Sequence, residues 1–129
     1  MHATGTFEVT IRPEAGSAPF VAAKLGRQTL DKTFSGQLQA HSAGEMLMAM
    51  GAVEGSAGYV AIERVDGTLD GRAGSFVLQH SGTMDRGVPT LRISVVPDSG
   101  SGELAGLAGT MAIQVDNGAH RYTFDYTLP

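Results

Sequence analysis

The feature that most constrains the fold is a glycine-punctuated run from Gly55 to Met84, which reads GSAGYVAIERVDGTLDGRAGSFVLQHSGTM. It contains two short segments rich in β-branched and aromatic residues, Tyr59–Val65 and Ser75–Thr83, with Asp-Gly pairs between them. Asp-Gly is typical of tight hairpin turns, because both turn residues must take a positive φ. The run therefore predicts two paired antiparallel strands.

Other segments of the chain alternate apolar and polar residues in the same way. In Thr4–Ile11, every second residue from Phe7 onward is apolar, which places one apolar face on a strand. The other expected strands are Lys24–Phe34, Ser35–Ser42, Glu45–Met50, Leu91–Val96, Thr110–Val115 and His120–Thr127. Asn117-Gly118 joins the last two and predicts a type I′ hairpin turn.

The segment Glu45–Met50 is the ambiguous one. Its alanine, glutamate, methionine and leucine residues are strong helix formers, yet Met46, Met48 and Met50 alternate as they would in a strand. Its short length and the flanking Gly44 and Gly51 favour a strand. The three methionines would then share one face, where they could line an adaptable apolar pocket or simply pack in the core.

A sheet of about eight antiparallel strands with one apolar face must stack on a second sheet or close on itself. We expect an all-β fold, an eight-stranded antiparallel closed barrel rather than a sandwich. The length of 129 residues fits one domain over residues 1–129. One long irregular stretch, Pro97–Gly109 (PDSGSGELAGLAG), interrupts the pattern.

The composition excludes several kinds of partner. With 13 acidic and 9 basic residues, the net charge is −4, and no basic stripe is present to neutralise phosphates, so nucleic acid is not an expected partner. The chain has no cysteine, which removes disulfides, thiolate nucleophiles and sulfur metal ligands. There is no long apolar run and no signal-like start, so we expect no membrane association and a cytoplasmic location.

Two stretches resemble the signature blocks of a known family. GSAGYVAIERVDGTLDGRAGSFVLQHSGTM and VVPDSGSGELAGLAGTM are similar to the blocks of an uncharacterised bacterial family of small proteins, itself similar in structure to allene oxide cyclase and, more remotely, to dirigent proteins. The resemblance runs from Thr4 to Leu128, and Ser101 stands where threonine is usual. It implies a calycin-like, eight-stranded barrel of the allene oxide cyclase type and assembly into oligomers. It implies no reaction, because a fold alone does not supply one.

Glu63 and His80 are the candidate catalytic and ligand-binding residues. His80 shares the parity of Phe76 and Leu78 and should point into the barrel with them. A carboxylate beside an imidazole in a dry cavity could act as an acid/base pair. The alternative is a structural contact that satisfies two buried polar groups.

The inward face of Tyr59–Val65 stays open at this point. Glu63 points inward only if Tyr59 and Ala61 do so as well. The opposite parity, with Val60 and Ile62 inward, is more apolar and would turn Arg64 toward the cavity.

The spacing of residues does not favour a metal site or a dinucleotide-binding site. The histidines and nearby glutamates form no HxH, HxxxH or HExxH pattern, so no metal is expected. Gly100, Gly102 and Ala105 satisfy a loose dinucleotide-binding spacing, but strands follow them where a helix would be needed. We expect no cofactor.

These observations leave three functional hypotheses. The first is a barrel that binds a small hydrophobic molecule in its lumen, and the second is an isomerase or cyclase similar to allene oxide cyclase. The third is a structural or assembly module with a filled lumen. The expected ligand-binding residues, beside the candidate pair, are Phe76, Leu78, Ile93, Tyr122 and Phe124. We also expect a dimer or trimer, because outward residues such as Leu47, Val60 or Ile62 would need cover.

Overall fold

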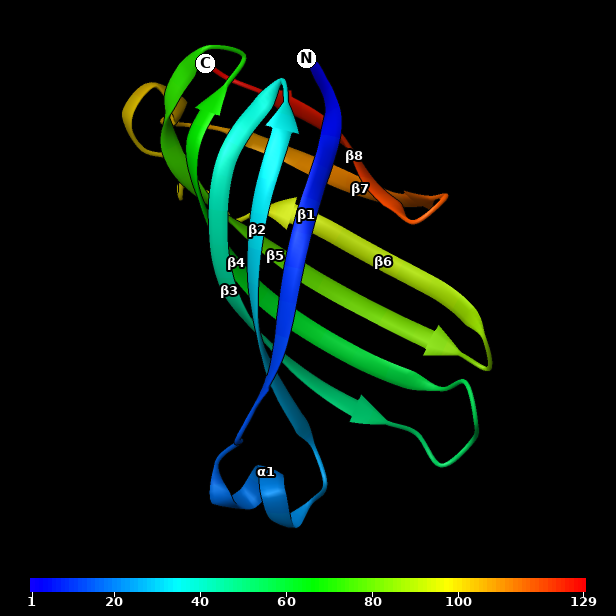
Figure 1. Cartoon of the computed structure of the whole chain (residues 1–129). Helices are drawn as coiled ribbons and strands as arrows, with labels where there is room; N and C mark the ends of the chain where they lie inside the picture. The colour runs from blue at the N-terminus through cyan, green and yellow to red at the C-terminus, as the bar shows by residue number, and fades with distance from the viewer.

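The computed structural model describes residues 1–129 and contains a closed antiparallel barrel of eight strands (Figure 1). Each strand pairs with the next along the chain, and β8 returns to pair with β1, which confirms the expected fold class. The strands are β1 (His2–Glu14), β2 (Gly26–Gly36), β3 (Leu38–Met50), β4 (Ala57–Leu69), β5 (Arg72–Asp85), β6 (Val88–Val95), β7 (Ala108–Asp116) and β8 (Ala119–Thr127).

Helix is limited to two short segments. α1 (Ala18–Ala22) connects β1 to β2, and η1 (Gly102–Leu104) is a 3-10 turn within the long irregular stretch. Neither has the length and apolar character that a helix needs to cross a membrane.

Glycine turns set the register of the hairpins. Asp70-Gly71, between β4 and β5, has φ values of 49° and 82°, and Asn117-Gly118, between β7 and β8, has 50° and 80°. Both residues of each pair take the positive φ that a type I′ turn requires, as predicted. Arg86-Gly87 forms the same kind of turn between β5 and β6, with φ values of 48° and 90°. Its arginine gives no turn signal in the sequence.

The region from residue 24 to residue 50 forms two strands, not the three expected from the sequence. The predicted Ser35–Ser42 strand spans the end of β2, the turn at Gln37 and the start of β3, and Glu45–Met50 is the second half of β3. Gly44 marks no break in β3. A Cβ atom there would lie 2.4 Å from the carbonyl oxygen of Ile62, so the glycine allows close approach of β4.

One half of the barrel is filled with side chains. Its core has 16 buried residues, including six aromatic rings from β1, β2, β5 and β8. The stretch between β6 and β7 covers this end, because Leu104 and Leu107 are each 1% exposed and belong to the same core. We call this region, from the Leu104 and Leu107 plug inward, the packed half.

The other half of the barrel is open at the side because the strands differ in length. β1, β3, β4 and β5 have 13 or 14 residues, whereas β7 and β8 have nine. β8 pairs only with His2–Phe7 of β1, and β7 pairs with β6 at two positions, Ile93 and Ser94. Beyond the short β7–β8 hairpin, the wall is therefore interrupted between β1 and β6, as Figure 1 shows.

Candidate functional site

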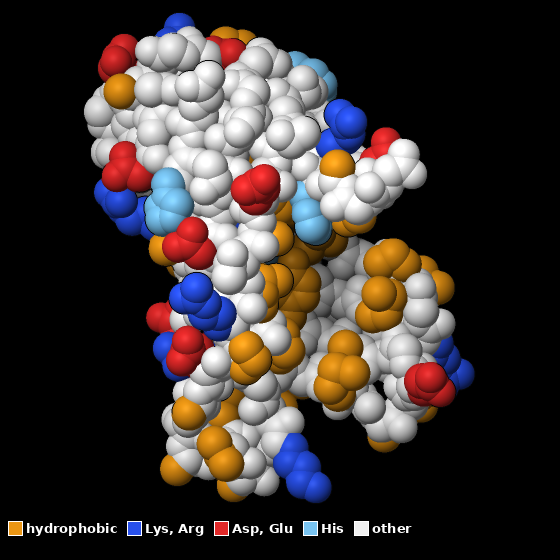
Figure 2. Space-filling view, in the orientation of Figure 1, with side chains coloured by type: hydrophobic (Ala, Val, Ile, Leu, Met, Phe, Trp, Pro, Cys, Tyr) orange, Lys and Arg blue, Asp and Glu red, His pale blue; other side chains and the backbone are white.

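An apolar groove occupies the open half of the barrel. It has a volume of about 480 Å³. Figure 2 shows hydrophobic side chains gathered in the hollow between the limb of β1, β2 and α1 and the limb that carries the ends of β3–β6. The lining residues are Ile11, Met46, Met48, Met50, Ala57, Gly58, Tyr59, Gly82, Thr83, Met84, Pro89, Thr90 and Leu91. None of them carries a charge, and we call this region the groove.

Four methionines give the groove its character. Met46, Met48 and Met50 of β3 lie on the inward face, as the alternation in the sequence predicted, and Met84 of β5 joins them. Methionine is flexible and polarisable, so a surface made of it can adjust to apolar molecules of different shapes. The groove is thus suited to an apolar occupant without demanding one shape.

A buried polar layer crosses the barrel interior between the groove and the packed half. It consists of Lys32 from β2, Ser42 from β3, Glu63 from β4 and His80 from β5. Glu63 lies at its centre and is 0% exposed. One carboxylate oxygen accepts from Lys32 Nζ at 3.1 Å and lies 2.8 Å from His80 Nε2, and the other accepts from Ser42 Oγ at 2.5 Å.

This geometry settles the inward parity of β4. Glu63 and Ala61 point inward, at 0% and 3% exposure, whereas Val60 and Ile62 are each 53% exposed on the outer surface. The more apolar alternative is therefore wrong. Glu63 can be buried because its charge is paired with that of Lys32 and both groups are hydrogen-bonded. No buried side-chain nitrogen or oxygen lacks a partner.

Glu63 is held as a carboxylate. Burial by itself would raise the pKa of Glu63, but the hydrogen bond from His80, the charge of Lys32 and the hydrogen bond from Ser42 together outweigh it. The net result is a pKa of Glu63 below its ordinary value. The layer therefore contains a carboxylate matched by an ammonium group, with the imidazole as a third member.

Lys32 and Ser42 belong to the site but were not among the predicted residues. Lys32 is 5% exposed, and its Nζ lies 5.0 Å from the ring centroid of Phe7 and 5.7 Å from that of Phe34. These aromatic faces stabilise the cation in addition to Glu63. A signal for Lys32 was present, since it stands two residues from both Leu30 and Phe34 and so shares their inward parity.

Tyr59 connects the groove to the polar layer. Its ring lines the groove, and the ring centroid lies 6.3 Å from that of His80. Burial, followed by the nearby charge of Glu63, raises the pKa of Tyr59, so the phenol keeps its proton. No role was predicted for Tyr59 beyond its possible inward parity.

The five other predicted ligand-binding residues lie elsewhere. They are all in the packed half and each is at most 1% exposed: Phe76, Leu78, Ile93, Tyr122 and Phe124. None of them lines the groove. Their parity was right, but aromatic rings and the Leu104 and Leu107 plug fill this part of the lumen, so a molecule in the groove would not touch them.

The remaining histidines lie apart from the polar layer. His41 bonds to Asp31 at 2.8 Å on the outer surface, and His2 bonds to Asp125. His120 packs against Phe7, with the ring centroids 5.1 Å apart.

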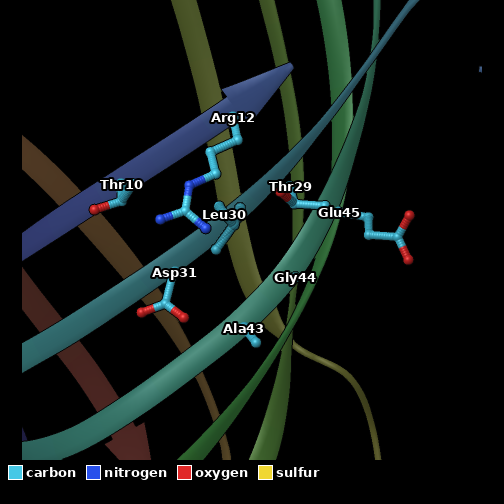
Figure 3. A pocket seen from close by; sticks show the side chains of 8 residues that line it. All are labelled: Thr10, Arg12, Thr29, Leu30, Asp31, Ala43, Gly44 and Glu45. Carbon is cyan, nitrogen blue, oxygen red and sulfur yellow. The ribbon is translucent and has the colours of Figure 1, made fainter. Parts of the chain in front are cut away.

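A second depression, of about 410 Å³, lies on the outer wall over β1, β2 and β3. Figure 3 shows Arg12 extending over β2 toward the side of Asp31, while Glu45 points away from both. These three side chains belong to exposed residues on the outer face of the barrel. Most residues that line the depression are polar or charged, in contrast to those of the groove.

The outward apolar residues expected to drive self-association are exposed. Leu47 is 41% exposed, and it pairs in register with Val60, which is 53% exposed. Together with Ile62 they form an apolar strip on the outside of β3 and β4. Assembly into a dimer or trimer stays a prediction.

Comparison with known proteins identifies the family. The family model described as "Protein of unknown function (DUF3224)" matches residues 3–126. A search of curated proteins finds no match. Among solved structures, the crystal structure of a DUF3224-family protein with unknown function from Shewanella oneidensis MR-1 is 56% identical, with a TM-score of 0.93 over 100% of this chain and 97% of that chain. The chain belongs to the DUF3224 family, the uncharacterised family that its signature blocks indicated.

Proposed function

We propose that this protein binds a small apolar molecule in the open half of its barrel. The observation that carries the proposal is the groove itself, about 480 Å³ in volume and lined by thirteen residues without a charge. Ligand pockets of small molecules commonly have volumes of roughly 300–1,000 Å³ and a mainly apolar lining with a few polar groups. The groove fits that description, with Tyr59 as its inner polar group.

The exposed apolar residues at the mouth of the groove support the same proposal. Ile11 on β1 is 48% exposed and Leu91 on β6 is 45% exposed, while Met50 at the end of β3 is 76% exposed. Contiguous apolar surface of this kind is costly in water and commonly marks a binding site. An apolar ligand between these strands would remove part of it from water.

The proposal is tested with N-phenyl-1-naphthylamine, an uncharged dye whose fluorescence rises in apolar surroundings. We expect saturable binding to the purified protein. Met48→Glu places a charge in the groove and should weaken binding by tenfold or more, since a buried carboxylate needs a partner that the groove does not offer. Val60→Glu makes a comparable change on the outer face of the adjacent strand and should leave the affinity unchanged.

Absence of saturable dye binding, or equal losses in both variants, would remove the proposal. The structural module with a filled lumen would then be the remaining hypothesis, because the packed half already meets that description. Mass spectrometry of small molecules that copurify with the wild-type protein and not with Met48→Glu would show the natural occupant.

A second candidate function is an isomerase or cyclase similar to allene oxide cyclase. The observation that favours it is the 2.8 Å contact between Glu63 and His80, together with Tyr59, which lines the groove and has its ring centroid 6.3 Å from that of His80. A groove of this kind could fold a reactive apolar substrate, while the polar groups stabilise charge that develops during rearrangement.

The two functions differ in what happens to the bound molecule. An isomerase changes the chromatographic retention of a compound without changing its mass. Apolar extracts incubated with wild-type protein and with Glu63→Gln are therefore compared by liquid chromatography and mass spectrometry. A pair of equal-mass peaks that interconverts only with the wild type supports catalysis, and copurified molecules that remain unchanged with both proteins support binding alone.

A further inference from the structure

The hydroxyl group of Tyr59 differs from those of the other two tyrosines. Tyr122 donates to the carbonyl oxygen of Ser35 at 3.0 Å, and Tyr126 donates to the carboxylate of Asp70. The Tyr59 hydroxyl has no hydrogen-bond partner within the protein, and it lies in a groove whose other side-chain hydroxyls belong to exposed threonines, Thr83 and Thr90. Since no buried side-chain oxygen lacks a partner, this hydroxyl is accessible to solvent, and an oxygen atom of a ligand could accept its hydrogen bond.

Resting on the proposed function, we propose that the groove selects uncharged apolar molecules with a hydrogen-bond acceptor, such as a carbonyl or ether oxygen. The Tyr59 hydroxyl would donate a hydrogen bond to this oxygen. The apolar part of such a ligand would lie along the methionines of β3. Its oxygen would face the inner end of the groove.

The preference for an uncharged ligand follows from the lining. No lysine, arginine or histidine lines the groove. The buried lysine of the interior, Lys32, is already paired with Glu63 in the polar layer. An ionised carboxylate in the groove would lose its hydration without gaining a countercharge, which is far more costly than burying a carbonyl group that receives one hydrogen bond.

The preference for an acceptor follows from the state and position of Tyr59. Because its pKa is raised by burial and by Glu63, the phenol remains a donor throughout the physiological pH range. Its ring lies against the backbone of Gly82, where a Cβ atom would be 2.4 Å from Cε1 of the ring. The missing side chain at Gly82 leaves room for the ring to pack against β5, and a ring packed in this way loses little freedom when a ligand binds.

The experiment compares three naphthalene probes of similar shape in calorimetric or fluorescence titrations: 2-acetylnaphthalene, 2-isopropylnaphthalene and 2-naphthoate. Tyr59→Phe removes the hydroxyl and keeps the ring. We expect this variant to bind 2-acetylnaphthalene about fivefold more weakly, a typical effect of one hydrogen bond, and to bind 2-isopropylnaphthalene as the wild type does. The wild type should bind 2-naphthoate at least tenfold more weakly than the ketone.

Two controls accompany the titrations. Tyr126→Phe removes a tyrosine hydroxyl from the packed half and should leave all three affinities unchanged. Melting temperatures confirm that both variants fold.

The outcomes separate this inference from the function on which it rests. If none of the probes binds the wild type, the proposed function fails. If the uncharged probes bind but Tyr59→Phe changes their affinities equally or not at all, ligand binding stands and the acceptor preference is overturned. Binding of 2-naphthoate as tight as that of the ketone would overturn the preference for uncharged molecules.

Discussion

The two halves of the barrel are built from the same strands and differ in what their inward residues do. In the packed half, six aromatic rings and the plug of Leu104 and Leu107 leave the core residues almost without exposure. In the open half, methionines and small residues line the groove, and Met50 is 76% exposed. The alternation of inward and outward residues is identical in both. The tightly packed core and the proposed binding surface thus lie at different ends of the same strands.

The buried polar layer stands at the boundary between the halves. On the side of the packed half, aromatic rings contact one another, and the ring centroids of Phe76 and Phe124 are 5.8 Å apart. On the other side, the smaller cluster of Leu30, Met46 and Ala61 leads into the groove. The ion pair between Lys32 and Glu63 is held in place by hydrogen bonds and separates the groove from the packed half. Substitutions in the packed half should therefore mainly affect stability, whereas substitutions in the groove should mainly affect binding.

The largest expected effect is the loss of stability when a core ring of the packed half is removed, compared with removal of a groove side chain. Phe124→Ala removes a ring that is 0% exposed and should lower the free energy of unfolding by about 3–5 kcal/mol, because it leaves a closed cavity. Met48→Ala removes a half-buried side chain from an open groove and should cost about 1 kcal/mol or less. Urea unfolding measures both. Similar losses would contradict this difference between the halves.

The polar layer is the next target. Glu63→Gln removes the carboxylate and leaves Lys32 as an uncompensated buried cation, so we expect a loss of about 3 kcal/mol in urea unfolding. Lys32→Met together with Glu63→Gln should restore part of that stability, because the cation is then gone as well. A double variant less stable than Glu63→Gln alone would show that Lys32 stabilises the fold by its packing and not through the ion pair.

The same layer makes stability depend on pH. Since the folded pKa of Glu63 lies below the ordinary 4.5, its contribution is present above about pH 4.5 and is lost as the pH falls through the folded value. The wild type should therefore lose its advantage over Glu63→Gln in this acid range only. An advantage that already shrinks between pH 5 and 7 would contradict this assignment to Glu63.

A smaller effect is expected where the groove meets β5. Gly82→Ala places a Cβ atom 2.4 Å from the Tyr59 ring, so the ring must move into the groove. We expect the affinity for N-phenyl-1-naphthylamine to fall about tenfold, roughly 1.4 kcal/mol. Gly58→Ala is the comparison variant: it also lies in the groove wall and gains the same methyl group, but its nearest neighbour would be the Gly82 carbonyl oxygen at 3.8 Å, so the ring need not move. Equal losses in the two variants would show that Tyr59 does not shape the groove.

The smallest expected effect is on the ionisation of the tyrosines in the two halves, which is measured by absorbance at 295 nm. Burial raises the pKa of all three tyrosines, and for Tyr126 burial and the Asp70 carboxylate raise it to about 12. We expect the folded protein to show less ionisation at pH 10 than the protein in urea. Because these pKa values are raised, the stability that they contribute is present below pH 10 and lost as the pH rises toward 12. Tyr59→Phe should leave the step at about pH 12 in place.

Most of the barrel could be predicted from local signals. Alternation identified the inward faces of β1, β5 and β8, and Asn117-Gly118 identified its hairpin, because both are properties of a few neighbouring residues. The break expected near Gly44 was wrong for a reason that no local signal carries. That glycine is required by the approach of β4, a contact between residues distant in sequence.

The candidate site was predicted only in part. The contact between Glu63 and His80 followed from pairing two adjacent strands, but Lys32 reaches them from β2, two strands away from Glu63, and a barrel must close before such side chains meet. The location of the groove depends on strand lengths. β7 and β8 end at Asn117-Gly118 while β1 continues to Glu14, and only their relative placement shows that the wall opens there.

The interruption between β1 and β6 leaves two strand edges without a neighbour, and free edges of this kind can recruit other chains into intermolecular sheets. Both edges carry a proline, Pro13 on β1 and Pro89 on β6, which offers no N–H group to an incoming strand. Exposed charges lie beside them, with Arg12 on one edge and Arg92 on the other. The opening beside the groove is thereby bordered by residues that disfavour edge-to-edge pairing with other chains.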